Sequence, residues 1–162
     1  MIKLFVMDVD GTLTDGKLFI GPSGELFKGF HSQDGMGITL LHKAGIHTAI
    51  ITGRQSEIVE ARAKELGIKE VFQKIKDKRP VLEKLVADLG LTMEEVAYIG
   101  DDTNDLGCLS IAGKAFIPAN AVDAIRGHGF IGLSRSGGEG AVREAIDLVF
   151  GFEDKTSARE TF

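Results

Sequence analysis

Short apolar runs alternate with helical segments along most of this chain, and that alternation constrains the fold more than any other feature. Six runs have strand character: IKLFVMDV (2–9), HTAIIT (47–52), EVFQKI (70–75), VAYIG (96–100), KAFIP (114–118) and GFIGL (129–133). A run that is apolar nearly throughout is typical of a strand buried on both faces of a parallel sheet. Strands separated by helices therefore predict an α/β fold, with helices on both faces of a doubly wound, mostly parallel sheet.

Helical periodicity and turn residues place the helices between these strands. The expected helices cover residues 34–45, 56–67, 79–90, 104–113, 121–127 and 139–150. The clearest of them, at 56–67, has its apolar residues on one face and Gly67 at its end, where a C-cap belongs.

Residues 17–30 (KLFIGPSGELFKGF) have a different pattern, because two short apolar runs flank a turn at 21–24. This pattern predicts a small β-hairpin inserted after the first strand. The stretches before the first helix and between Thr52 and Lys78 are too short for a separate cap domain. We expect one domain over residues 1–150, followed by a flexible polar tail over 151–162.

Composition and charge exclude several classes of function. The net charge of −5 argues against general nucleic-acid binding, which requires a basic face. The apolar runs are too short to span a membrane, and the early aspartates interrupt the N-terminal run before it could act as a signal peptide. A single cysteine, Cys108, allows no internal disulfide and suits a reducing compartment, so we expect a cytoplasmic protein without nucleic-acid or membrane partners.

Polar residues gather directly after four of the predicted strands. Because ligands of such folds bind beyond the carboxyl ends of the strands, these residues are the candidates for a site. In chain order they are Asp8, Asp10 and Asp15; Thr52, Gly53 and Arg54; Lys74, Lys76, Lys78 and Arg79; and Asp101, Asp102, Asn104 and Asp105.

Two of these carboxylates predict a metal ion. Asp8 and Asp101 follow strands that we expect to be neighbours, and carboxylates with backbone carbonyls and water are ligands that suit Mg²⁺. The four histidines show no paired spacing of the kind that binds zinc.

A divalent cation beside a lysine and a hydroxyl group points to phosphoryl chemistry. Asp8 can act as the nucleophile and form an aspartyl-phosphate, while Lys78 supplies positive charge behind the phosphate. Thr52 and nearby amides can hold phosphate oxygens. Asp10 can protonate the leaving oxygen and then activate water. Gly11 lets the chain turn so that its amides approach the phosphate.

Each of these features is common by itself, as a polar turn, a helix cap or a surface lysine, and only their order at successive strand ends makes them specific. A receiver-like signalling module also uses acids, a threonine and a lysine around Mg²⁺. It lacks a second acid such as Asp10, however, and it does not explain the hairpin. A non-catalytic relative would be expected to lack one of the key acids or the lysine, and all of them are present.

The sequence resembles the haloacid dehalogenase superfamily in all four of its motifs. Asp8-Val9-Asp10-Gly11-Thr12-Leu13-Thr14 is similar to the D-x-D-G-x-[LT] motif, and the second, third and fourth motifs are matched by Thr52-Gly53-Arg54, Lys78 and Gly100 to Asp105. The resemblance implies a cap-less member in which Mg²⁺ is held by the Asp8 side chain, the Asp10 backbone carbonyl and Asp101. It assigns supporting roles to Gly11, Gly53, Asp102 and Asp105.

A closer resemblance, over about residues 1–150, is to cap-less members that hydrolyse 3-deoxy-D-manno-octulosonate 8-phosphate in lipopolysaccharide sugar synthesis. It implies a homotetramer in which the hairpin of one subunit covers the site of its neighbour. It also implies substrate contacts from Arg54, Arg62 and Asp34. Relatives acting on nine-carbon keto-deoxy sugar acids tend to carry an acid where Arg54 stands, so a nine-carbon substrate or a broad sugar specificity is the alternative. His31 departs from the asparagine-like residue of the pattern, and Arg159 in the tail is a candidate lid residue.

Overall fold

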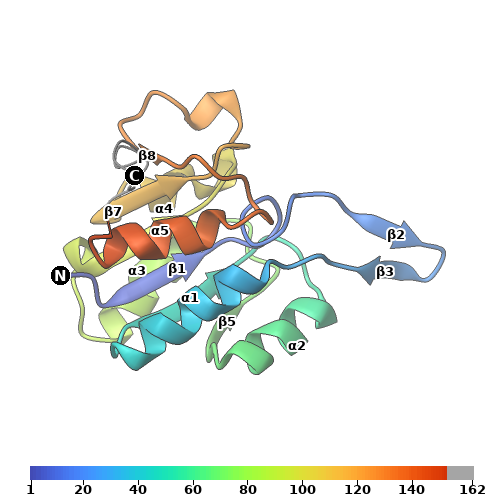
Figure 1. The fold of residues 1–162 in the computed structure, drawn as a ribbon, viewed down its shortest axis with the longest axis horizontal. Coiled ribbons are helices and arrows are strands. Elements are labelled where there is room, and N and C mark those ends of the chain that lie inside the picture. The colour runs from blue at the N-terminus through green and yellow to red at the C-terminus, as the bar shows by residue number, and fades with distance from the viewer. Residues whose placement is uncertain (153–162) are drawn as a thin grey trace, which may run out of the picture.

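The computed structural model describes residues 1–152, and their centre is a six-stranded sheet in which every strand is parallel to its neighbours (Figure 1). The strand order is β5-β4-β1-β6-β7-β8. The bounds are β1 Leu4–Met7, β4 His47–Ile51, β5 Glu70–Phe72, β6 Val96–Ile99, β7 Lys114–Ile117 and β8 Ile131–Gly132. The predicted parallel α/β fold is therefore confirmed.

The central strand β1 sets the position of the polar residues that follow it. Met7, its last residue, lies opposite Ile50 of β4 and Ile99 of β6. Because the three strands end at nearly the same level, the segments that follow them meet at one edge of the sheet. The residues that follow β4 and β6, the two neighbours of β1, therefore lie beside Asp8 and Asp10.

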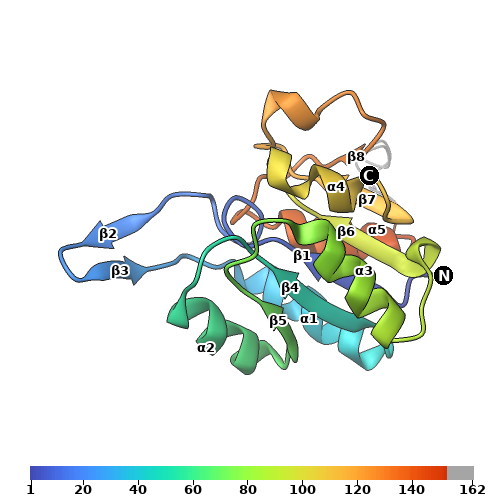
Figure 2. The same cartoon turned by 180° about the vertical axis from the view of Figure 1, so that it is seen from behind.

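Helices cover both faces of the sheet, as the alternation predicts (Figure 2). One apolar cluster joins the sheet to α1 (Ser32–Lys43), α2 (Glu57–Leu66) and α5 (Ala141–Val149). The opposite cluster joins it to α3 (Lys78–Asp88) and α4 (Leu106–Leu109). Phe5 and Met7 of β1 point into the first cluster and Leu4 and Val6 into the second, all fully buried, so β1 is apolar on both sides.

The helix ends follow from local hydrogen bonding, and some differ from the prediction. Helix α2 has the expected ends, with Ser56 as N-cap and Gly67 in the left-handed conformation at φ 73°. Helix α1 begins earlier than expected, because the His31 ring accepts a hydrogen bond from the Gln33 N–H and caps it. An asparagine at this position would cap the helix in the same way.

Two predicted helices are wrong in extent. The segment 104–113 forms only the 3₁₀ turn η2 (Thr103–Asp105) and the short α4, because the Asp105 carboxylate accepts from backbone N–H groups and tightens the first turn. The segment 121–127 forms only the 3₁₀ turn η3 (Asp123–Ile125), and a further turn, η1 (Met93–Glu95), precedes β6.

The predicted hairpin is present and extends away from the body of the domain (Figure 1). Strands β2 (Phe19–Gly21) and β3 (Gly24–Phe27) are antiparallel, and the Phe19 and Phe27 rings stack with centroids 4.3 Å apart. Its apolar side chains are largely exposed, and they are Leu18, Phe19, Ile20, Leu26 and Phe27.

Residues 1–152 contain no cap domain. Nothing in this part of the chain is both long and apolar enough to form a membrane-spanning helix. Most of the predicted tail, including Arg159, lies outside the described residues.

Packing of α1 against the sheet can be tested by shortening one side chain. Leu41 of α1 is fully buried in the first cluster, so Leu41→Ala should lower the free energy of unfolding by about 2–5 kcal/mol. Urea unfolding followed by circular dichroism measures this change. Lys43→Ala, an exposed position on the same helix, is the matched control. A loss below about 1 kcal/mol for Leu41→Ala would contradict the packing.

Candidate active site

An open cavity of about 190 Å³ lies at the carboxyl ends of the strands. It gathers residues from the first, second and fourth of the predicted polar segments, and they are Asp8, Asp10, Thr52, Gly53, Arg54, Asp101, Asp102 and Asn104. Sequence positions far apart thus form one site, as the parallel topology predicts.

Lys78 is buried beside this cavity and joins two of the motifs. Its side chain is inaccessible to solvent, and its Nζ lies 2.7 Å from Asp8 Oδ1 and 2.7 Å from Asp105 Oδ1. A buried ammonium group is stable only when carboxylates compensate the lost hydration. Lys78 is the first residue of α3, so these two ion pairs also fix the start of that helix next to the site.

Asp105 is held from all sides by hydrogen-bond donors. Its Oδ1 accepts from Lys78 and from the Tyr98 hydroxyl, each at 2.7 Å, and its Oδ2 accepts from the backbone N–H groups of Asp101 and Asp102 at 3.0 and 3.3 Å. Tyr98 is fully buried on β6 and was missed by sequence reasoning, because a tyrosine in a buried strand reads as core. Asp105 therefore supports Lys78 and the loop that carries Asp101.

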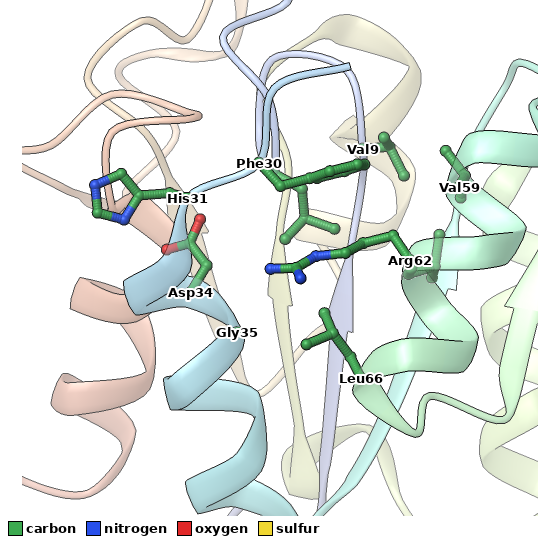
Figure 3. A pocket seen from close by; sticks show the side chains of 10 residues that line it. Val9, Phe30, His31, Asp34, Gly35, Val59, Arg62 and Leu66 are labelled. Atoms are coloured by element: carbon green, nitrogen blue, oxygen red, sulfur yellow. The ribbon is translucent and has the colours of Figure 1, made fainter. Parts of the chain in front are cut away.

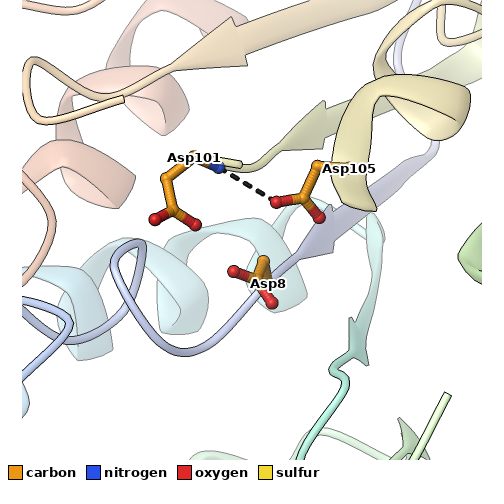
Figure 4. Close-up of side chains that lie close together, drawn as sticks. All are labelled: Asp8, Asp101 and Asp105. Atoms are coloured by element: carbon orange, nitrogen blue, oxygen red, sulfur yellow. Dashed lines mark hydrogen bonds between the residues drawn. The ribbon is translucent and has the colours of Figure 1, made fainter. Parts of the chain in front are cut away.

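Asp8, Asp101 and Asp105 form a carboxylate cluster that can hold a metal ion, since one oxygen from each lies within 4.8 Å of the others (Figure 4). Burial raises the pKa of Asp8 well above its usual value; the charge of Asp105 adds to this and Lys78 opposes it. Burial likewise raises the pKa of Asp101. The cluster has more carboxylates than the single ammonium of Lys78 can neutralise, so a hard cation with oxygen ligands fits the donor set. Asp8 and Asp101 are the better ligands because both Asp105 oxygens already accept from protein donors.

Gly11 is required where the chain turns past the cluster. Its φ is +89°, and a Cβ at this position would lie 1.9 Å from Asp101 Oδ2. The turn is further held by Asn120, whose Nδ2 donates to the Gly11 carbonyl at 2.9 Å. Asp15, the remaining acid of the first segment, accepts from the Lys17 N–H at 2.9 Å and so orders the start of the hairpin.

Lys28, at the base of the hairpin, also reaches the site and was not predicted. Its side chain is 2 % exposed, and its Nζ lies 2.7 Å from Asp10 Oδ1 and 3.0 Å from Glu25 Oε2. Glu25 in turn accepts a hydrogen bond from the Ser56 hydroxyl at 2.5 Å. The only sequence signal is a lysine three residues after a glutamate in an otherwise apolar hairpin, and that signal alone indicates a surface ion pair.

The other predicted site residues divide between two pockets. Thr52, buried, and Arg54 line the catalytic cavity, and Asp102 also caps η2 by accepting from the Thr103 N–H at 2.6 Å. Arg62 and Asp34 instead line a separate, narrow pocket between α1 and α2 (Figure 3). Their contact with substrate therefore stays a prediction.

The second pocket contains two buried polar atoms without a hydrogen-bond partner among residues 1–152, Asp34 Oδ2 and Arg62 Nε. The Arg62 guanidinium lies over the Phe30 ring, 5.5 Å from its centroid. The other carboxylate oxygen of Asp34 accepts from the Arg143 N–H at 2.9 Å and ties α1 to α5. Burial raises the pKa of Asp34 to about 6.

The chain is similar in sequence to known hydrolases. The sequence model of the haloacid dehalogenase-like hydrolases matches residues 37–113. The 3-deoxy-D-manno-octulosonate 8-phosphate phosphatase KdsC of Haemophilus influenzae is 39% identical over 160 residues, which cover 99% of this chain and 89% of that protein. KdsC of Escherichia coli K12 is 37% identical, with 91% and 79% covered. The chain therefore belongs to the haloacid dehalogenase-like hydrolases and, among them, to the family of the KdsC phosphatases.

Solved structures of this family have the same fold. The 3-deoxy-D-manno-octulosonate 8-phosphate phosphatase of Yersinia pestis superposes with a TM-score of 0.90 at 38% identity, covering 96% of this chain and 84% of that one. The Moraxella catarrhalis phosphatase, in complex with magnesium ion, phosphate ion and KDO, gives 0.89 at 41% identity, with 97% and 90% covered. The predicted family and the cap-less fold are confirmed.

The buried Asp34 predicts a pH-dependent stability. A carboxyl group whose pKa is raised from 3.8 to about 6 in the native state holds a proton that the unfolded chain releases. The contribution of Asp34 to stability is therefore fully present below pH 4 and is lost as the pH rises through 6, a change of up to about 3 kcal/mol. Asp34→Asn keeps an acceptor for Arg143 but cannot ionise, so at pH 7.5 it should be more stable than the wild type.

Urea unfolding at pH 4 and pH 7.5 tests this expectation, because the advantage of Asp34→Asn should vanish at the lower pH. Asp123→Asn is the control, since the Asp123 side chain is fully exposed. An equal stability difference at both pH values would show that the charge of Asp34 is not responsible.

Proposed function

We propose that the protein is a Mg²⁺-dependent phosphomonoesterase that hydrolyses 3-deoxy-D-manno-octulosonate 8-phosphate to KDO and phosphate. The observation that carries the proposal is the buried Lys78 between Asp8 and Asp105, beside a cavity that Asp8, Asp10 and Asp101 line. The likeness to KdsC phosphatases over nearly the whole chain supports the substrate.

The nucleophile of the reaction is a carboxylate oxygen of Asp8. It attacks phosphorus, and the bond from phosphorus to the sugar oxygen breaks as the aspartyl-phosphate forms. Lys78 holds Asp8 in place and contributes positive charge beside the phosphate. Bound Mg²⁺, held by the Asp8 and Asp101 carboxylates and the Asp10 backbone carbonyl, would reduce the repulsion between the attacking carboxylate and the phosphate.

Proton transfer falls to Asp10 in both half-reactions. Its carboxylic acid protonates the departing sugar oxygen, and its carboxylate then removes a proton from the water that attacks the aspartyl-phosphate. Thr52 and the N–H of Gly53, two residues that line the cavity, bind phosphate oxygens. Asp105 accepts a hydrogen bond from the Asp101 N–H and Asp102 accepts one from the Thr103 N–H, so both hold the turn that begins at Asp101.

The choice of substrate depends on groups beyond the phosphate. Arg54 lines the catalytic cavity, and its planar guanidinium suits the carboxylate of a keto-deoxy sugar acid. An arginine in this place favours the eight-carbon acid over the nine-carbon alternative. The signalling alternative is disfavoured, because membership of a hydrolase family and an acid at Asp10 both point to turnover.

The hairpin supports a homotetrameric assembly in which it covers the site of a neighbouring subunit. It projects from the domain, and Ile20 and Leu26 are 57 and 62 % exposed. Exposed apolar patches of this kind mark interaction surfaces in proteins that are otherwise polar outside. A cytoplasmic location, expected from the single cysteine, stays a prediction.

Phosphate release with several substrates tests the proposed reaction. With Mg²⁺, 3-deoxy-D-manno-octulosonate 8-phosphate should be turned over faster than a nine-carbon sugar-acid phosphate or a hexose phosphate, and EDTA should stop the reaction until Mg²⁺ is restored. Asp8→Asn should lose on the order of 10⁴-fold or more of kcat, because the nucleophile is removed. Its near-UV circular dichroism should match the wild type. Metal-independent turnover, or substantial activity of Asp8→Asn, would refute the mechanism.

The role of the hairpin can be tested without disturbing its base. A double variant, Ile20→Ser with Leu26→Ser, removes exposed apolar surface and leaves the contacts of Lys28 intact. Light scattering should show a smaller assembly, and kcat/KM should fall with it because the neighbouring site loses its cover. A monomer with full activity would rule out the shared site.

A further inference from the structure

We propose that Lys28, at the base of the hairpin, is a positioning residue for the reaction. It holds Asp10, the general acid and base, of the same subunit. This inference rests on the proposed phosphatase function and adds a role that the four sequence motifs do not contain. It also gives the hairpin a second task, within its own subunit, beside any cover that it provides to a neighbour.

The geometry singles out Lys28 from the other lysines. Its Nζ contacts one oxygen of Asp10 at 2.7 Å, and within residues 1–152 no hydrogen bond engages the second oxygen. Asp10 itself lines the catalytic cavity. The ammonium group thus fixes the orientation of the carboxyl group and leaves one oxygen free for proton transfer.

Burial distinguishes this contact from an ordinary surface ion pair. The Lys28 side chain is 2 % exposed and its two carboxylate partners are 22 and 16 % exposed, so water and salt reach the contact less than they reach a surface ion pair. Glu25 anchors Lys28 from the other side, and Ser56, the N-cap of α2, anchors Glu25. This chain of contacts ties Asp10, the hairpin base and the second motif loop into one unit.

The arrangement suits the first half of the reaction. As the Asp8 oxygen bonds to phosphorus and the bond to the sugar oxygen breaks, the proton on Asp10 moves to that oxygen. Asp10 becomes a carboxylate, and the adjacent Lys28 ammonium stabilises its new charge. In the second half water bonds to phosphorus, the bond to Asp8 breaks, and the water proton returns to Asp10 beside the same ammonium.

The dependence of the rate on the leaving group tests this role. An alkoxide needs a proton to depart, whereas p-nitrophenolate does not, so a misplaced acid harms only the sugar phosphate. In Lys28→Met, kcat/KM for 3-deoxy-D-manno-octulosonate 8-phosphate should fall by about 10- to 100-fold, part of the 10²–10⁴-fold that a general acid supplies. For p-nitrophenyl phosphate, kcat/KM should change less than about threefold. Lys28→Arg, which keeps the charge, should recover part of the loss.

A double-mutant cycle supplies an independent readout. If Lys28 acts through Asp10, Lys28→Met should change the rate of Asp10→Asn by less than about twofold, whereas independent effects would multiply. If the wild type does not hydrolyse p-nitrophenyl phosphate, this cycle on the sugar phosphate decides alone. Lys69→Met is the control, because Lys69 is exposed and directly precedes β5, at the amino ends of the strands and away from the site.

Three results would overturn the proposal: equal losses on both substrates, multiplicative effects in the cycle, or a rise in KM with unchanged kcat, which would make Lys28 a substrate contact. Failure of the underlying function looks different, because then the wild type itself would release no phosphate from the sugar phosphate.

Discussion

A buried ammonium group between two carboxylates organises the catalytic edge of this protein. Lys78 carries a charge into the interior, where Asp8 and Asp105 offset the loss of hydration. The contact joins the end of β1, the start of α3 and the turn after β6, so these three segments cannot shift independently. Removing Lys78 would leave two buried carboxylates without this compensation, which is why the acids and the lysine form one unit.

The sheet makes this contact possible, and the hairpin extends it. The parallel strands β4, β1 and β6 end at nearly the same level. The loops that follow them therefore lie at one edge of the sheet, where their charged side chains meet. Lys28 then brings a second buried ammonium to Asp10 from a segment that is otherwise an exposed, apolar projection. Each aspartate of the D-x-D pair thus has its own lysine, and the two lysines approach from different elements.

Much of the fold was predictable because its signals are local. The apolar run of β1, the turn at 21–24 and the caps of α2 depend on residues that are neighbours in the chain, and all were located correctly. The helix after Asp105 was not, because its first turn is shaped by hydrogen bonds between a side chain and the loop before it. Arg62 and Asp34 line a separate pocket, which the sequence did not indicate because periodicity does not show toward which pocket a helical side chain points; their contact with substrate stays a prediction.

The sequence by itself determined which chemical groups stand at the strand ends and in what order, because a parallel sheet brings those ends together whatever the details of packing. Only the tertiary structure decided how the charges pair. Lys78 meets Asp8 across 70 positions and Lys28 meets Asp10 across 18, and nothing local distinguishes these lysines from those at the surface. Burial makes the difference, because an ammonium group away from water must find a carboxylate, and the packed fold fixes which one is within reach.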